Sequence, residues 1–589
     1  EIPLRLVGSE MCIRDRVCIL KKQSFLKGSA ILMGMVIITK ILGLMYKIPL
    51  THMLGGTGMG YFSSAYAVFT PIFAIVVSGI PSTIARMVAE NYAFERYRNV
   101  RKIKRTAMII FSTAGLSASL LVLALSKLLS EGVIHEPSAV WSLIGVAPSV
   151  FLGTIMSVER GYYEGLRNMI PTAVSEIVET IFKLIFGLGF AYAVMNYAET
   201  SFYQTGGCFG QFCRTIEDAR STALPFITGA SILGVTLATG IGSLYIIISG
   251  KIHGDGITKQ MLEQDKSTDR TLTLFRRLVK YAVPIAVASV ITTLTNMIDL
   301  ITINPCLSKA IEKNVILFSQ LTENNLTSQT LPNFIYGSYT GLAVTIFGLV
   351  PTLTAMFGKS ILPNLAESWA KKDHSCIQRN LSGMLFITSI IAVPSGIGIS
   401  LMSKEILEFL YGGRTDEIAV SVLPLTILGA GVIFMGISIP CFSALQTIGK
   451  PKLPVIIMLV SGAAKLVFNI ILIPIPALNI SGAAISTVIS QGIICIWSAA
   501  AMLKTSGVRI SAKEIFVKPL FSGLLCGATA RLLYDVLTVY LPFSLNYRLI
   551  LLISIFSGSI MYFFSLYLLC VLPKKQIKAF FYKKIYKTY

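Results

Sequence analysis

Charged residues are scarce in this chain. Of its 589 residues only 14% are charged, whereas 54% are hydrophobic and the mean hydropathy is +0.72. A soluble domain carries about one-quarter charged residues, which it needs to cover a surface that faces water. The shortage of charge therefore excludes a soluble multidomain protein.

Motifs of metal, cofactor and enzyme chemistry are missing as well. The ten Cys include no CxxC pair or Cys/His cluster, and the four His are isolated, which argues against structural zinc and thiol-redox centres. There is no Walker A motif, nucleophile elbow or HExxH motif, so ATP-driven transport and the common hydrolase reactions lack their parts. We expect no enzyme, no catalytic residue, no metal and no cofactor.

Long apolar runs, by contrast, recur along the whole chain. A helix needs about 20 apolar residues to cross a bilayer. We predict an all-α polytopic membrane protein with about fourteen transmembrane helices, which lie at 26–50, 60–85, 106–128, 138–158, 171–196, 222–249, 279–302, 337–361, 381–402, 418–445, 453–475, 480–503, 516–540 and 548–571.

Lys and Arg gather in short tracts between these runs. With the N-terminus placed inside, the tracts predicted to be cytoplasmic carry 34 Lys and Arg, and those on the other side carry 8. Loops that stay in the cytoplasm retain basic residues. We predict a multi-pass protein of a bacterial cytoplasmic membrane with both termini in the cytoplasm. Tracts of this kind attract anionic membrane lipids rather than nucleic acid.

The first residues do not resemble the rest of the chain. Residues 1 to about 16 have no helical period and no signal-peptide core, and they resemble a translated sequencing-library adapter, so we expect the native start near Leu20–Lys22. We predict the following organisation: 1–20 a non-native tract, 21–250 an N-lobe of six helices, 251–278 a cytoplasmic inter-lobe loop, 279–505 a C-lobe of six helices, 506–573 two further helices and 574–589 a basic cytoplasmic tail.

A weak internal repeat supports two lobes. The segment from Pro171 to Lys183-Leu184-Ile185-Phe186 is echoed by the segment from Pro454 to Lys465-Leu466-Val467-Phe468. Both predicted halves begin on the same side of the membrane. We therefore predict a parallel repeat of two six-helix lobes, with a pseudo-axis along the membrane normal.

Several ionisable residues fall inside predicted helices, where a charge at the bilayer centre costs roughly 2.5–3.5 kcal/mol. Lys40 and Lys47 share one face of the first helix because they are seven residues apart. The fifth helix carries a further set on one face, Glu176, Glu179 and Lys183. Later helices carry Asp299, Lys359, Lys465, Arg531 and Asp535.

Two interpretations of these charges remain open. In the first, Lys40, Lys183 and Lys465 line a water-filled cavity and attract a phosphate-bearing headgroup, with Lys47 and Lys359 nearer the gates. In the second, the lysines are partners in structural ion pairs, and Glu176 and Glu179 neutralise Lys183. The carboxylates Glu176, Glu179 and Asp299 are also candidates for ion coupling. Arg531 and Asp535, four residues apart, suit a pair near the membrane interface.

Two loops carry features of their own. The run Gly55-Gly56-Thr57-Gly58-Met59-Gly60 joins two apolar helices without a preceding strand, so it predicts a tight loop rather than a phosphate cradle. Cys208 and Cys213 flank four residues of a loop predicted to be external. Their spacing allows either a disulfide or two incidental thiols.

The stretch ITKILGLMYKIPLTHMLGGTGMGYFSSAYAVFTPIFAIVVSGIPSTIARMVAE (38–90) resembles the first two helices of the stage V sporulation protein B family. ERGYYEGLRNMIPTAVSEIVE (159–179) is similar to the most recognisable loop of that family. The segments 336–367 and 442–490 continue the resemblance, which covers nearly the whole chain after residue 21. The family belongs to the multidrug/oligosaccharidyl-lipid/polysaccharide exporter superfamily, which includes the lipid II flippases.

The resemblance implies fourteen helices in two six-helix lobes, with the last two helices forming a groove for a polyprenyl tail. It also implies alternating access driven by the membrane potential or an ion gradient. Lipid II flippases have arginines and an Arg-Asp pair in their first two helices. Lys40 and the pair Tyr46-Lys47 stand in the corresponding places here, which leaves the identity of the headgroup open.

Three functional hypotheses follow. The leading one is a flippase for an undecaprenyl-pyrophosphate-linked saccharide, a precursor of peptidoglycan or of a surface polysaccharide, acting as a monomer beside cell-wall synthesis enzymes. The second is a cation-coupled multidrug exporter of the same fold. The third is a membrane-embedded polysaccharide polymerase or ligase, which needs an outer loop equipped for catalysis, whereas the loop 303–335 contains no His. The sugar, the coupling ion and a sporulation or vegetative role stay open.

Overall fold

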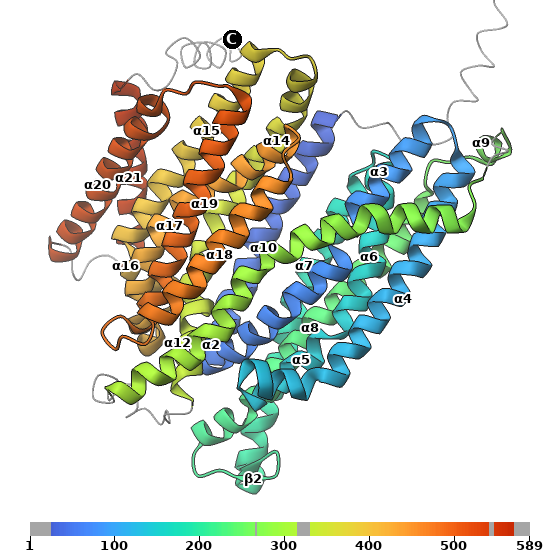
Figure 1. The fold of residues 1–589 in the computed structure, drawn as a ribbon. Coiled ribbons are helices and arrows are strands. Elements are labelled where there is room, and N and C mark those ends of the chain that lie inside the picture. Colours follow the sequence, from blue (N-terminus) through green and yellow to red (C-terminus); the bar gives the residue numbers. More distant parts are fainter. Residues whose placement is uncertain (1–24, 265–267, 315–329, 541–546, 570–589) are drawn as a thin grey trace, which may run out of the picture. The chain divides into compact units, whose positions relative to one another are not determined.

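The computed structural model describes residues 25–264, 268–314, 330–540 and 547–569, and almost all of them are helical (Figure 1). The chain divides into two compact units. The first holds residues 1–50 and 64–293, and the second holds 51–63 and 294–589. The prediction of an all-α membrane protein is therefore confirmed.

The first unit consists of long helices and one short hairpin. Two of its helices, α2 and α10, continue into the second unit. In chain order its elements are α2 (Phe25–Val77), α3 (Ile80–Ala93), α4 (Tyr97–Leu129), the π-turn η1 (Ser130–Ile134), the 3₁₀ turn η2 (Pro137–Ala139), α5 (Val140–Val146), α6 (Pro148–Gly165), α7 (Ile170–Thr205), β1 (Gly207–Cys208), β2 (Gln211–Phe212), α8 (Ile216–His253), α9 (Lys259–Gln264) and α10 (Thr271–Lys313).

Helices are the only regular secondary structure of the second unit among the residues that the structure describes. Its elements after α10 are α12 (Leu331–Ser338), the π-turn η4 (Tyr339–Ala343), α13 (Val344–Phe347), α14 (Leu349–Ala370), α15 (His374–Leu401), α16 (Ser403–Tyr411), α17 (Thr415–Thr447), α18 (Lys452–Leu472), α19 (Asn479–Ser506), the π-turn η5 (Lys513–Val517), α20 (Lys518–Tyr540) and α21 (Tyr547–Leu568).

Local sequence signals set several helix ends. Thr215 and Asp218 form a capping box at the start of α8, in which each side chain accepts a hydrogen bond from the backbone N–H of the other residue. The carboxylate of Asp373 accepts from the backbone N–H of Cys376 at the start of α15. Gly206 ends α7 in the left-handed conformation, at φ 68°, which glycine adopts without steric cost.

Every predicted transmembrane segment lies mainly within helices. Among the described residues, 12 helical segments are long and apolar enough to cross a membrane. The first of these segments, Gly34–Ala93, spans 60 residues, whereas one crossing needs about 20. The loop expected at 303–335 begins later, since α10 continues to Lys313, and residues 315–329 lie outside the described part of the chain. The chain is a multi-pass membrane protein, and the count of fourteen helices stays a prediction.

The glycine-rich run after the first predicted helix is not the loop that the sequence suggested. The structure reduces it to a single-residue break in α2 at Gly55, where φ is 61° and ψ is −171°, and the residues that follow are helical. The backbone N–H of Gly56 donates to Oε1 of Glu417, 3.1 Å away, and the guanidinium of Arg414 donates to the carbonyl of His52. Side chains from the start of α17 thus satisfy backbone groups that the break leaves open.

The helical glycines after the break allow a close approach of two backbones. A Cβ added to Gly337 on α12 would lie 1.9 Å from the carbonyl oxygen of Gly56 and 2.3 Å from the amide nitrogen of Gly60. No side chain fits there, so this contact between α2 and α12 requires glycine. Small residues allow membrane helices to pack at short distances in this way.

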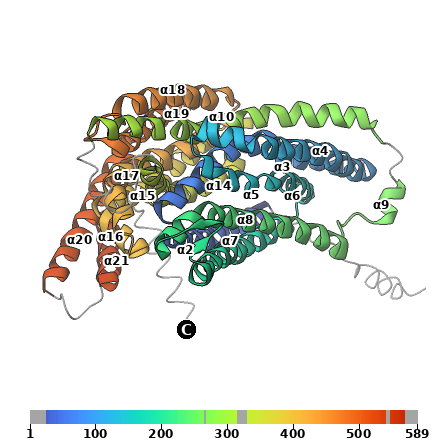
Figure 2. The ribbon, with the colours of Figure 1, turned by 90° about the horizontal axis from the view of Figure 1, so that it is seen from below.

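The hairpin β1–β2 connects the long helices α7 and α8. These two helices run side by side in both views (Figures 1 and 2). Cys208 and Cys213 lie in and just after this hairpin. Both are buried and both are free thiols in the structure, so of the two alternatives it shows the unpaired one.

Ion pairs tie the first turns of α4 to the segments around α9. Arg101 contacts the carboxylate of Asp255 at 3.2 Å, and Arg96 contacts that of Asp269 at 2.6 Å. Tyr162 of α6 also donates to Asp255, at 2.8 Å. Burial of Asp255 raises its pKa, but the hydrogen bonds from Arg101 and Tyr162 and from the backbone N–H of Ile257 outweigh burial, so the pKa lies below its ordinary value of 3.8.

The last two helices pack together and against α15 (Figure 1). Gly523 and Gly527 of α20 face side chains of α15, and a Cβ on Gly527 would lie 2.6 Å from Leu401. The hydroxyl of Tyr562 on α21 donates to the carbonyl of Ile390 on α15, at 2.9 Å. These contacts make α15, α20 and α21 a three-helix layer within the second unit.

Candidate functional site

Three of the predicted lysines come together in the first unit. Lys40 and Lys47 lie on α2 and Lys183 lies on α7, and Lys183 is within electrostatic range of both. Lys40 is exposed, whereas Lys47 and Lys183 are partly buried. The seven-residue spacing on α2 predicted that its two lysines share a face, and the packing of α7 adds the third. We call Lys40, Lys47 and Lys183 the lysine cluster.

The ring of Tyr46 orients Lys183, a contact that the sequence did not predict. Its ammonium nitrogen lies 5.1 Å from the centre of the Tyr46 ring, within the range of a cation–π interaction. The hydroxyl of Tyr46 makes a 3.0 Å hydrogen bond with the hydroxyl of Ser231 on α8. Gly187, one turn after Lys183, leaves room for the ring, because a Cβ there would lie 2.6 Å from it.

The acidic residues of α7 have partners of their own. One oxygen of Glu179 accepts from Arg160 at 3.0 Å, and the other accepts from Thr239 at 2.9 Å. Arg160 also donates to Ser175 at 3.0 Å. Glu179 remains within electrostatic range of Lys183, but its hydrogen bonds go elsewhere. Arg160 follows the predicted helix 138–158 in the sequence, whereas α6 continues through it. Glu176, partly buried, lies one turn before Glu179.

A buried ion pair occupies the second unit. Nζ of Lys465 on α18 lies 2.7 Å from Oδ2 of Asp299 on α10, and the two side chains are only 3% and 15% exposed. Asn469, four residues after Lys465, donates to Oδ1 of Asp299 at 3.1 Å and to the hydroxyl of Thr302 at 2.8 Å. Ser486 of α19 donates to the carbonyl oxygen of the Asn469 side chain. For Lys465 this geometry favours the interpretation as an ion-pair partner.

Three other predicted charges are Lys359, Arg531 and Asp535. Lys359 lies in α14, and its side chain is outside what the structure describes. Arg531 pairs with Asp535 at 3.1 Å, as its spacing predicted, and also contacts Glu405 of α16 at 2.5 Å. Among the described residues, no group of three or more His, Cys, Asp or Glu side chains could hold a metal ion.

An apolar pocket of about 450 Å³ lies in the layer formed by α15, α20 and α21. Its walls are almost entirely hydrocarbon, because they include Ile390, Pro394, Ala530, Ile555 and Phe563. A pocket lined in this way accepts an aliphatic chain and excludes polar groups, which would lose their hydrogen bonds to water.

Comparisons with known proteins agree with this architecture. The sequence profile of a family described as polysaccharide biosynthesis protein matches residues 25–209. Over these residues the chain is similar to this family. It is 23% identical to the lipid II flippase MurJ of Bacillus subtilis over 478 residues, which cover 78% of this chain and 79% of the relative. It is also 23% identical to the stage V sporulation protein B of the same organism over 495 residues, or 84% of this chain and 86% of the relative.

Solved structures show the same fold. An inward closed conformation of the lipid II flippase MurJ aligns with a TM-score of 0.61 at 14% identity, over 91% of this chain and 98% of that one. An inward-facing multidrug resistance transporter of the MATE family aligns with a TM-score of 0.58 at 12% identity, over 80% and 96%. The predicted resemblance is therefore confirmed. The proteins named by these comparisons are flippases and transporters rather than enzymes.

Proposed function

We propose that the chain is a flippase that moves an undecaprenyl-pyrophosphate-linked saccharide from the inner to the outer leaflet of the cytoplasmic membrane by alternating access. The observation that carries the proposal is the lysine cluster. Three ammonium groups gather on two long, mainly apolar helices, although each desolvated charge is costly. A doubly charged phosphate-bearing substrate would account for these charges, because it neutralises them when it binds.

The geometry of the cluster suits a headgroup that enters and leaves. Lysine acts as a compact point charge on a flexible stem, so it follows a moving pyrophosphate without a fixed angle. Tyr46 holds Lys183 through its ring and leaves the ammonium hydrogens able to contact a ligand. Glu179, which would compete for that ammonium, is held by Arg160 and Thr239. We expect the pyrophosphate to contact Lys40 and Lys183 directly.

The apolar pocket between α15, α20 and α21 supports the lipid half of the proposal. A polyprenyl chain is an aliphatic, branched hydrocarbon without hydrogen-bonding groups, which matches the pocket wall. Its burial there would gain roughly 25 cal/mol for each Å² of apolar surface withdrawn from water. In this proposal the lysine cluster of the first unit matches the anionic headgroup, and the pocket of the second unit matches the hydrocarbon tail.

The names of the curated relatives support the same substrate class. One is a lipid II flippase, and the other is a sporulation protein of similar length. We therefore propose a peptidoglycan precursor, or a precursor of another surface polysaccharide, as the cargo. For Lys465 we propose a structural role, as the buried ion-pair partner of Asp299, rather than contact with the headgroup.

The alternative function is a cation-coupled multidrug exporter, which the likeness in fold to the MATE transporter leaves possible. Such an exporter needs an acidic residue inside the membrane that binds and releases a cation. Glu179 and Asp299 are both engaged by basic side chains. Replacing either bond with a proton or a metal ion would first require breaking an ion pair, which favours the flippase.

Complementation of a conditional strain that has lost its lipid II flippase tests the proposal. We expect the wild-type chain to restore growth and the variants Lys40→Gln and Lys183→Gln to fail, while Lys40→Arg and Lys183→Arg retain more activity than the Gln variants. Lys371→Gln is the matched control, because Lys371 is exposed and pairs with Glu367 on the surface. Normal growth with both Gln variants at equal expression would reject the role of the cluster.

A further inference from the structure

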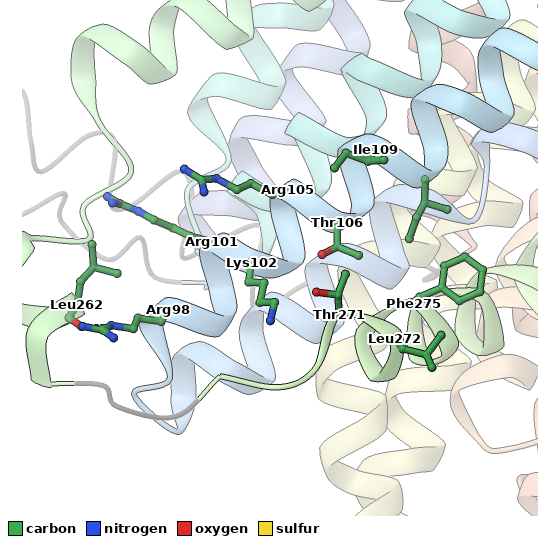
Figure 3. Close-up of a pocket in the computed structure, with 11 residues that line it drawn as sticks. Arg98, Arg101, Lys102, Arg105, Thr106, Ile109, Leu262, Thr271, Leu272 and Phe275 are labelled. Carbon is green, nitrogen blue, oxygen red and sulfur yellow. The ribbon is translucent and has the colours of Figure 1, made fainter.

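A second basic site lies on the first unit, apart from the lysine cluster. A groove of about 750 Å³ runs between the first turns of α4, the end of α9 and the start of α10. Four basic side chains of α4 line it, and Figure 3 shows them along successive turns of one helix: Arg98, Arg101, Lys102 and Arg105. The spacing of three to four residues places these charges along one side of α4.

The charges of this groove are only partly satisfied within the protein. Arg101 pairs with Asp255 at 3.2 Å. Arg98 donates to the carbonyl of Leu262 at 2.7 Å, and Lys102 donates to the carbonyl of Asp269 at 2.6 Å. Arg105 is exposed and, among the described residues, makes neither an ion pair nor a side-chain hydrogen bond. The groove therefore retains an excess of positive charge that an anion would neutralise.

The other wall of the groove is apolar and exposed. Leu272 and Phe275, at the start of α10, are 59% and 41% exposed, and Ile109, one turn after Arg105, is 68% exposed. Figure 3 shows the two α10 side chains beside α4. A site for a soluble anion has no use for such a wall, because the apolar surface would stay in contact with water.

The apolar surface continues away from the charges along α4. Leu116 and Leu120 lie on the same side of the helix as Ile109, at spacings of seven and eleven residues, and are 45% and 56% exposed. Each residue advances the helix by about 1.5 Å, so the basic turns give way to hydrocarbon within one helical turn. This order of charge followed by an exposed apolar stripe matches a lipid headgroup followed by its acyl chain.

We propose that this groove is a binding site for an anionic glycerophospholipid of the surrounding bilayer. The phosphate contacts Arg105 and Lys102, and one acyl chain lies on Leu272, Phe275, Ile109 and the apolar stripe of α4. The bound lipid belongs to the inner leaflet, because the sequence predicts this end of α4 to be cytoplasmic. Basic pockets between membrane helices on the cytoplasmic side suit anionic headgroups. This inference is independent of the cargo proposed above.

Native mass spectrometry of the purified full-length protein in detergent tests the site. Phosphatidylglycerol is titrated against the wild type, Arg105→Gln, Arg105→Lys and Leu272→Gln, with phosphatidylcholine as the neutral lipid and glycerol phosphate as the soluble anion. Arg105 is chosen because its replacement removes no ion pair or side-chain hydrogen bond among the described residues, so we expect the variant to fold. Lys371→Gln serves as a control for the loss of one exposed basic charge elsewhere.

We expect the tightest bound phosphatidylglycerol to dissociate about fivefold more readily from Arg105→Gln, as the loss of one basic contact near a headgroup predicts. Arg105→Lys should restore most of the binding, Lys371→Gln should match the wild type, and phosphatidylcholine should not occupy the site. Leu272→Gln should weaken the lipid but not glycerol phosphate. Equal binding by wild type and Arg105→Gln would overturn the proposal. Competition by glycerol phosphate, with no effect of Leu272→Gln, would instead identify a site for soluble anions.

Discussion

The ammonium nitrogen of Lys183 lies 5.1 Å from the centre of the Tyr46 ring, and Tyr46 is joined to Ser231 through its hydroxyl. The ring therefore links α2, α7 and α8 at the level of the lysine cluster. A lysine on an aromatic face keeps its charge without needing a carboxylate as partner. The relationship explains how a cation can be oriented inside a membrane protein and remain available for the anionic substrate proposed above.

Replacement of Tyr46 should separate the role of the ring from that of its hydroxyl. Tyr46→Phe keeps the ring under Lys183 and loses only the bond to Ser231, so we expect transport to fall by less than about threefold. Tyr46→Leu removes the aromatic face, worth about 0.5–2 kcal/mol, and transport should fall by up to about thirtyfold. Rates of lipid flipping in proteoliposomes at matched protein content measure both. Equal rates for the two variants would exclude a role for the ring.

The Lys465–Asp299 pair predicts a strong dependence of stability on both partners. Lys465→Gln leaves the Asp299 carboxylate buried without its cation, and removal of one partner of a buried pair costs about 3–5 kcal/mol. We expect the variant to unfold at a clearly lower temperature in detergent. The double variant Lys465→Gln/Asp299→Asn should recover most of the loss, because no uncompensated charge remains.

The thermal unfolding of all four proteins forms a double-mutant cycle for this pair. Strictly additive effects of the two substitutions would contradict a direct interaction. Lys465→Arg supplies a further comparison, because it keeps the charge and enlarges the side chain next to Asn469 and Ser486. It should be more stable than Lys465→Gln and less stable than the wild type.

The ion pair of Asp255 with Arg101, near the start of α4, should make the free energy of unfolding depend on pH. Its folded pKa lies below 3.8, so the carboxylate stabilises the folded state above that value, and the stabilisation disappears as the pH falls through the folded pKa. We expect Asp255→Asn to be less stable than wild type by about 1–3 kcal/mol at pH 7, and the difference to shrink below pH about 4. Glu263→Gln, at an exposed carboxylate of α9, is the control. A difference independent of pH would contradict the argument.

The apolar pocket of the second unit predicts a steric block. Ser559 lines the pocket, whereas the next residue, Ile560, is 57% exposed and does not line it. Ser559→Trp should fill part of the 450 Å³ and reduce transport of a full-length polyprenyl substrate several-fold. Ile560→Trp adds a ring of the same size outside the pocket and should leave transport unchanged. A substrate with a shortened tail should be less sensitive to Ser559→Trp.

The orientation predicted from the basic tracts can be tested directly. Reporter fusions after residues 92, 262 and 508 should report the cytoplasm, and fusions after residues 205 and 320 should report the outside. Position 262 is the decisive one, since it lies beside the basic groove of α4 and α10. An external signal there would reverse the topology and place the proposed phospholipid site in the outer leaflet.

The sequence by itself determined the class of the protein and the positions of its helices. Hydropathy and charge are properties of single segments, and a helix must satisfy its own backbone hydrogen bonds in a bilayer, so each apolar run specifies its own structure. Within one helix the sequence also predicted correctly which side chains lie on the same side: Lys40 and Lys47 both approach Lys183 from α2, and Arg531 pairs with Asp535 on α20. These relationships depend only on the 3.6-residue period.

Contacts between helices were decided by the tertiary structure. The sequence offered Lys183 and Lys465 as equivalent residues of a repeat, but one lies on an aromatic ring and the other is bound to Asp299. Glu179 had a neighbouring lysine on its own helix and is hydrogen-bonded by Arg160 from another. Gly55 looked like part of a loop, yet Glu417, 362 positions later, completes a break within a helix. A buried polar group takes the partner that packing brings within hydrogen-bond distance, and that choice depends on the relative placement of helices, which no single segment encodes.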